Sequence, residues 1–165
     1  LVFHTVMTED RSVVDLLAGC FTWVNRRLAG HYGFPDVANE KFVRVSLEGT
    51  RRRGVLTHAS ILTGLSDGHD GHPIKRGVWL LKNLLDDPPP PPPPNVPELD
   101  REDSKLEGLT IPQALALHRD DPSCMGCHQK IDPWGIAFEE YDAVGNWQRD
   151  GRGCSPSQKT HAATD

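Results

Sequence analysis

The sequence predicts a mainly α-helical chain in which two small helical units are joined by a polyproline linker, and two observations support this. Apolar residues recur at spacings of three and four over several segments, which is the period of an amphipathic helix. Seven consecutive prolines, Pro88 to Pro94, then interrupt the chain. Because proline lacks an N–H and has a fixed φ, this run predicts an extended polyproline II rod. We interpret the rod as a stiff spacer rather than as the ligand of a proline-binding module.

This interpretation divides the 165 residues into four parts. A helical domain covers residues 1–87, the linker covers 88–97, a second domain covers 98–150, and an irregular tail covers 151–165. The chain opens without an initiator Met, so it is expected to be a piece of a longer protein.

Composition argues against two classes of function. The formal net charge is −5, whereas a general nucleic-acid binder needs a basic face. No apolar run approaches the roughly 20 residues that span a bilayer, so no membrane span is predicted. Hydrophobic residues make up 37% of the chain, which predicts a small core.

The first part of the chain predicts a helical hairpin and a strand. Residues 10–33 carry an apolar helical stripe, which Gly19 divides into two short helices. Thr22 is expected to cap the second helix, and Gly33 is expected to end it. Apolar residues alternate over 41–47, which predicts a strand.

The next part predicts a turn, a loop and two helices. Residues 51–53 are three arginines, which suggest an anion site, although a solvated turn is favoured. A short helix over 54–63 and a loop over 66–72 follow. Apolar spacings of four, three and four after Pro73 predict an amphipathic helix that ends near Leu85.

The second domain is also predicted to be helical. Thr110 and Gln113 form a capping box that starts a helix over 111–119. Residues 132–135, Asp-Pro-Trp-Gly, predict a turn, and residues 136–141 predict one more short helix.

One motif carries recognisable chemistry, and it reads Cys124-Met125-Gly126-Cys127-His128. This is the spacing of c-type haem attachment. Two thiols on one helical turn can each add to a haem vinyl group, and the next residue places an imidazole under the iron. Covalent attachment also lets a small domain hold a cofactor with little core. The sequence therefore predicts haem c bound by Cys124, Cys127 and His128, with His128 as the proximal iron ligand.

Zinc is the alternative cofactor. His118 or Cys154 could complete a four-ligand zinc site with the three motif residues. Adjacent Cys and His ligands are awkward for one tetrahedral ion, and no second paired cluster exists, so haem is favoured. A thioredoxin-like redox pair would need βαβ flanks, whereas the flanking pattern is helical.

A six-coordinate haem also needs a distal ligand. Met125 lies inside the attachment loop on the proximal side and cannot reach round the haem. His118 is the preferred candidate because it shares a helical face with Ile111 and Leu115. The other candidates are His58, His69, His72, Met7 and an open or externally supplied site.

Three stretches resemble families that are known by number only. Residues 74–85, with the proline run and Asn95-Val96-Pro97, resemble the domain of unknown function 1588. Residues 118–147, which include the cysteine motif and Tyr-Asp-Ala-Val-Gly-Asn-Trp, resemble the companion domain 1585. Residues 1–32 resemble the end of domain 1592. The resemblance implies a large secreted protein of Planctomycetes or related bacteria, in which a cytochrome c domain often lies upstream.

These observations predict covalent haem binding and electron transfer within a larger secreted protein in an extracytoplasmic (periplasmic or secreted) location. The upstream cytochrome c domain is the expected redox partner, and an electron-transfer module is favoured over a catalyst. The alternatives are a haem enzyme with an open axial site and a structural interaction module held together by haem or zinc. Trp134, Phe138 and Trp147 are expected to pack against the haem. The tail over 151–165 departs from the family pattern.

Overall fold

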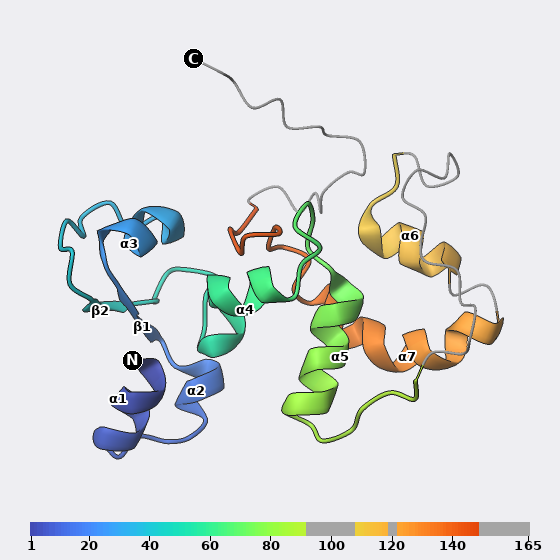
Figure 1. Ribbon diagram of the computed structural model, residues 1–165, viewed down its shortest axis with the longest axis horizontal. Coiled ribbons are helices and arrows are strands. Elements are labelled where there is room, and N and C mark those ends of the chain that lie inside the picture. The colour runs from blue at the N-terminus through green and yellow to red at the C-terminus, as the bar shows by residue number, and fades with distance from the viewer. Residues whose placement is uncertain (92–107, 119–121, 149–165) are drawn as a thin grey trace. The chain divides into compact units, whose positions relative to one another are not determined.

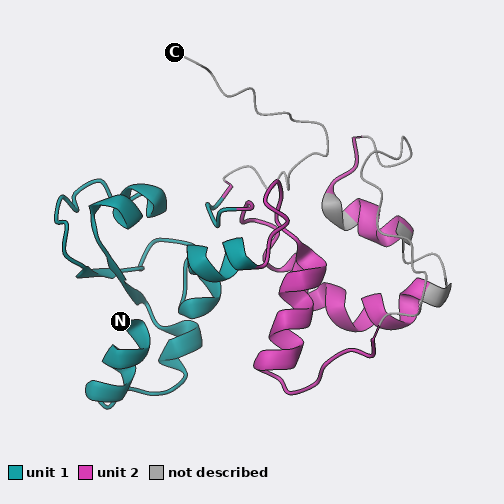
Figure 2. Cartoon of the chain, in the orientation of Figure 1, with its two compact units in different colours: residues 1–64, 144–147 teal, residues 65–143, 148–165 magenta. Residues whose placement is uncertain are grey.

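The computed structural model describes residues 1–91, 108–118 and 122–148 (Figure 1). The described residues are mainly helical, as predicted, and they include one small two-stranded sheet. They form two compact units (Figure 2). Unit 1 contains residues 1–64 and 144–147, and unit 2 contains the described residues between 65 and 143 together with residue 148. None of the described helices has the length and apolarity needed to cross a membrane.

Unit 1 packs short helices around an antiparallel strand pair. Strand β1 pairs with β2 so that Phe21 lies opposite Ser46 and Val24 lies opposite Val43. Val2, Val6 and Phe21 form a buried apolar cluster. The elements in chain order are α1 (Val2–Thr8), α2 (Asp15–Ala18), β1 (Phe21–Val24), α3 (Arg26–Tyr32), β2 (Val43–Ser46), the 3₁₀ turn η1 (Val55–Thr57) and α4 (Ala59–Gly64).

The predicted helical hairpin over 10–33 is wrong in its middle, where β1 replaces the start of the second helix. The segment Phe-Thr-Trp-Val consists of aromatic and β-branched residues, which suit a pleated strand, and β2 offers it a pairing partner. Thr22 is therefore a buried strand residue, and Asn25 caps α3 by accepting a 3.0 Å hydrogen bond from the Leu28 N–H. Gly33 ends α3 as predicted, with φ at 79°.

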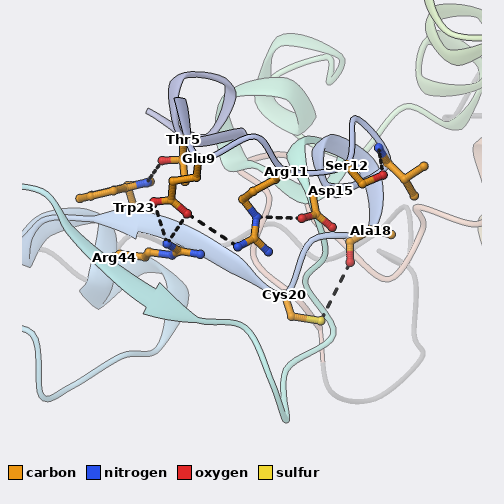
Figure 3. A network of polar contacts seen from close by, with 10 residues as sticks. Thr5, Glu9, Arg11, Ser12, Asp15, Ala18, Cys20, Trp23 and Arg44 are labelled. Atoms are coloured by element: carbon orange, nitrogen blue, oxygen red, sulfur yellow. Dashed lines mark hydrogen bonds and ion pairs between the residues drawn. The ribbon is translucent and has the colours of Figure 1, made fainter. Parts of the chain in front are cut away.

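Helix α1 is joined to the sheet by a polar network that the sequence pattern does not reveal (Figure 3). The Trp23 indole donates a 2.9 Å hydrogen bond to the Thr5 hydroxyl. The Arg44 guanidinium donates to both Glu9 carboxylate oxygens, at 3.0 and 3.1 Å. The same guanidinium lies 4.3 Å from the centre of the Phe21 ring. These contacts connect the middle and the C-terminal end of α1 to the strand pair.

The arginine triplet does not form the solvated turn that was predicted. Arg52 is buried, and its guanidinium donates to the carbonyls of Thr57 (2.7 Å) and Gly145 (2.5 Å). It also lies 3.9 Å from the centre of the Tyr32 ring. The two carbonyls belong to separate segments of unit 1, so the hydrogen bonds of Arg52 connect residues 144–147 to the rest of that unit.

Unit 2 is built on the packing of α5 (Pro73–Asn83) against α7 (Pro122–Ile136), with α6 (Ile111–His118) beside α7 (Figure 1). His72 caps α5, since its Nδ1 accepts a hydrogen bond from the Lys75 N–H. One half of the predicted capping box is present at α6, where the Gln113 side chain accepts from the Thr110 N–H at 2.9 Å. The buried apolar residues of this unit are Leu80, Leu81, Ala114, Leu115, Ile131, Tyr141 and Ala143.

The two units therefore divide near Gly64, and α5 belongs with α7 rather than with the residues before it. This differs from the predicted boundary at the prolines, because the apolar face of α5 needs a partner and α7 supplies it. Of the predicted linker, Pro88 to Pro91 carry no regular secondary structure, and 92–97 lie outside the described residues. The whole predicted tail over 151–165 and residues 98–107 also lie outside them.

Helix α7 continues through the predicted turn over 132–135. Pro133 lies in the last turn, where it cannot donate a backbone hydrogen bond and its ring crowds the carbonyl four residues earlier. The predicted helix over 136–141 is also wrong, because residues 137–140 form successive turns. The fully buried Arg76 accounts for this, since it donates 2.8 Å hydrogen bonds to the carbonyls of Phe138, Tyr141 and Asp142. The Phe138 carbonyl also accepts the Tyr141 N–H at 3.1 Å, which is the i to i+3 contact of a turn rather than the i to i+4 contact of an α-helix.

The close crossing of α5 and α7 depends on Gly77. A Cβ at this position would lie 2.6 Å from the Ile131 carbonyl oxygen, which is backbone and cannot easily move. We expect Gly77→Ala to lower the free energy of unfolding by about 1–3 kcal/mol, because overpacking forces the backbone to shift. Urea denaturation followed by circular dichroism measures the change.

Gly30→Ala is the matched control for this prediction. Gly30 lies inside α3, and nothing lies within 4 Å of a Cβ built on it. Alanine should therefore raise stability there by about 0.5–1 kcal/mol, because glycine is unfavourable in a helix interior. Changes of the same sign and size in both variants would contradict the close-approach argument.

Candidate functional site

Cys124, Cys127 and His128 all lie on α7. Their spacing of three and four residues places them on one face of the helix, over little more than one turn. Both cysteines are partly accessible thiols outside any disulfide bond. The structure thus brings the three predicted site residues together, in reduced form, on one stretch of regular backbone.

Asp132 extends this face by one further turn. The His128 Nδ1 lies 2.9 Å from the Asp132 Oδ1. The side chain of His128 is 14% exposed, and that of Asp132 is 1% exposed. A carboxylate can only accept a hydrogen bond, so this geometry suits an imidazole that carries its proton on Nδ1. Any metal bound by this imidazole would therefore be bound through Nε2.

This set of donors fits haem c. Two reduced thiols and an imidazole with its second nitrogen held by a carboxylate are the groups that covalent haem attachment and axial ligation require. Sequence reasoning missed Asp132, which it assigned to a turn. The available signal was a His and an Asp four residues apart, which share a face once the segment is a helix.

The residues proposed for zinc are only partly described. Among the side chains that the structure describes, no three His, Cys, Asp or Glu residues stand close enough to hold a metal ion. The side chain of His118, at the end of α6, and the whole of Cys154 lie outside the described part of the chain. Zinc therefore remains an alternative prediction.

The other distal candidates lie in several places. Met7 (64% exposed) and His58 belong to unit 1. His72 belongs to unit 2 and serves as the cap of α5, and His69 is exposed in the preceding loop. The distal role of His118 is untested, as its side chain is not described.

The three aromatic candidates also differ in their surroundings. Trp134 is 42% exposed and lies two helical turns after Cys127, so the two share a stripe of α7. Phe138 is partly buried, and its carbonyl accepts from Arg76. Trp147 belongs to unit 1, where the Arg51 guanidinium lies 5.7 Å from its ring centre. Trp134 is thus the aromatic side chain on the same helix as the motif.

His58 is a partly buried titratable group in unit 1. Its Nε2 lies 3.3 Å from the Thr22 hydroxyl oxygen. Burial lowers the pKa of His58 below its usual value, and the positive charge of Arg52 adds to this effect. A folded state with a lowered histidine pKa binds fewer protons than the unfolded chain. This histidine therefore contributes less stability as the pH falls below about 6.5, until the folded-state pKa is reached.

We expect the difference in free energy of unfolding between the wild type and His58→Gln to change with pH. The wild type should lose stability relative to the variant as the pH is lowered from 8 to 5. Only the wild type has an imidazole at this position that binds a proton more weakly in the folded state than in the unfolded chain. Paired urea denaturation curves at the two pH values measure it. A difference that stays constant with pH would show that His58 has the same pKa in both states.

Comparison with known sequences identifies one family. The profile described as "PSCyt3: Protein of unknown function (DUF1588)" matches residues 52–151. The match covers the stretch that resembles domain 1588 and extends over the cysteine motif, which lies in the stretch that resembles domain 1585. The likeness to domains 1585 and 1592 and to planctomycete proteins remains a prediction. No curated protein and no solved structure matches the chain.

Proposed function

The chain belongs to the DUF1588 protein family, and we propose that it binds haem c covalently through Cys124 and Cys127 and serves in electron transfer. His128 is the proximal axial ligand in this proposal. The observation that supports it best is the hydrogen bond of His128 Nδ1 to the buried Asp132, because metal-ligating histidines are regularly held in this way.

Covalent attachment of the haem is an addition reaction that needs no oxidant. Each thiol adds across one vinyl C=C bond, so that a C–S bond forms and the thiol hydrogen moves to the neighbouring vinyl carbon. Reduced, partly accessible thiols are what this addition needs, and both cysteines meet that condition. The bound haem would supply a one-electron Fe(III)/Fe(II) couple.

The wider setting belongs to the same proposal. Attachment through both thiols takes place outside the cytoplasm, so we place the protein in the periplasm or outside the cell. We propose that it forms part of a larger secreted bacterial protein of the planctomycete type. A cytochrome c domain upstream in that protein would be its redox partner.

The deciding experiment is an absorption spectrum of the full 165-residue chain, with a pyridine haemochrome assay on denatured protein. The chain is expressed in the periplasm with a haem-attachment system and, for comparison, in the cytosol without one. We expect covalent haem in the first preparation alone, with a low-spin spectrum. A high-spin spectrum that responds to peroxide would favour the haem enzyme instead. Bound zinc without a Soret band would overturn the proposal.

A further inference from the structure

The carboxylate of Asp132 faces the imidazole of His128 from the next turn of α7, at 2.9 Å. It is 1% exposed, and its neighbour Ile131 packs against α5 at the Gly77 crossing. The contact therefore lies on the packed side of the helix. An exposed pair at this spacing would contribute little to stability, but this one is shielded from water.

Burial of this carboxylate is costly, which makes a purely stabilising role a weak explanation. Removing a charge from water is unfavourable, and buried ion pairs can often be replaced by apolar residues without loss of stability. The contact instead sets two properties of the imidazole. It fixes the proton on Nδ1, and it makes Nε2 a stronger electron donor because a negative charge lies behind the ring.

We propose that Asp132 is a positioning residue for His128: it selects the Nδ1–H tautomer, presents Nε2 as the ligand atom and lowers the reduction potential of the bound haem. This inference rests on the proposed function for its last part only. The potential falls because a more strongly donating imidazole favours ferric over ferrous iron.

The tautomer is tested in the full chain before haem is added. ¹⁵N-detected imidazole spectra near pH 8 distinguish the two neutral tautomers of His128. We expect the Nδ1–H form alone in the wild type, and a large share of the Nε2–H form in Asp132→Ala. An Nε2–H wild type, or a variant with an unchanged tautomer, would overturn the proposal.

The electronic effect is tested in the haem-loaded chain with Asp132→Asn, which keeps the shape of the side chain and removes its charge. We expect covalent haem to be retained and the midpoint potential to rise. The expected rise corresponds to about a tenfold weaker preference for ferric iron, or about 59 mV for a one-electron couple. A potential equal to that of the wild type would overturn this part of the proposal.

Asp87→Asn is the matched control. Asp87 also belongs to unit 2, and its exposed carboxylate pairs with Lys130 of α7 rather than with His128. Asp87→Asn removes one negative charge near α7, as Asp132→Asn does. If the midpoint potential changes in Asp132→Asn alone, the direct contact with His128 is the cause. A wild type that takes up no haem but shows the Nδ1–H tautomer would refute the proposed function and leave the positioning role of Asp132 standing.

Discussion

The double variant Cys124→Ala/Cys127→Ala should contain no covalent haem after periplasmic expression, because no thiol remains in the motif to form a thioether bond. Each single variant should retain one thioether, yield less haem and shift the pyridine haemochrome band. His128→Ala should keep both thioethers and lose the proximal ligand, so its spectrum should change spin state while the haem stays attached.

Cys20→Ala is the control for this series. Cys20 is an exposed thiol in unit 1 and lies outside the motif. Its loss should leave the haem yield and the pyridine haemochrome band unchanged. Equal haem content in the double variant and the wild type would refute covalent attachment through this motif.

Arg76→Ala should cause the largest loss of stability among the predicted single changes. The guanidinium donates to three carbonyls, those of Phe138, Tyr141 and Asp142, and it is 1% exposed. A buried carbonyl left without a donor costs about 1–3 kcal/mol, whereas the Phe138 carbonyl keeps a 3.1 Å hydrogen bond from the Tyr141 N–H. We therefore expect a loss of about 3–5 kcal/mol in the free energy of unfolding, measured by urea denaturation, and a partial rescue by Arg76→Lys.

Arg26→Ala provides the comparison on the surface. Its guanidinium forms a 2.8 Å ion pair with Glu40, and both side chains are well exposed. Such a pair contributes about 0–1 kcal/mol, so the variant should unfold close to the wild type. Similar losses for the two arginines would mean that the carbonyl contacts of Arg76 contribute little.

The helices that could be predicted are those whose signals are local. The apolar spacing after Pro73 and the capping box at Thr110 each specify a helix within a few residues, and both helices form. Strand β1 could not be recognised in the same way. Its four residues also fit a helical stripe, and only pairing with β2, some 20 residues later, favours the extended form.

In the candidate site, too, local features could be predicted and features that depend on tertiary contacts could not. The motif residues were found from their spacing, because the chemistry of attachment fixes it. The contact of Asp132 with His128 requires α7 to continue through Pro133. A proline at that position predicts a turn, so the local sequence did not reveal the contact. The packing of α5 against Ile131 and Gly135 favours the longer helix, and such tertiary contacts are not visible in a local pattern.

The two buried arginines also determine when each unit can finish folding. Arg76 binds carbonyls 62 to 66 residues further along the chain, and Arg52 binds one 93 residues further. Neither unit is complete until residues 138–145 have been synthesised. Residues 138–145 therefore close both units, and a chain that ended before them would lack carbonyl acceptors of both buried arginines.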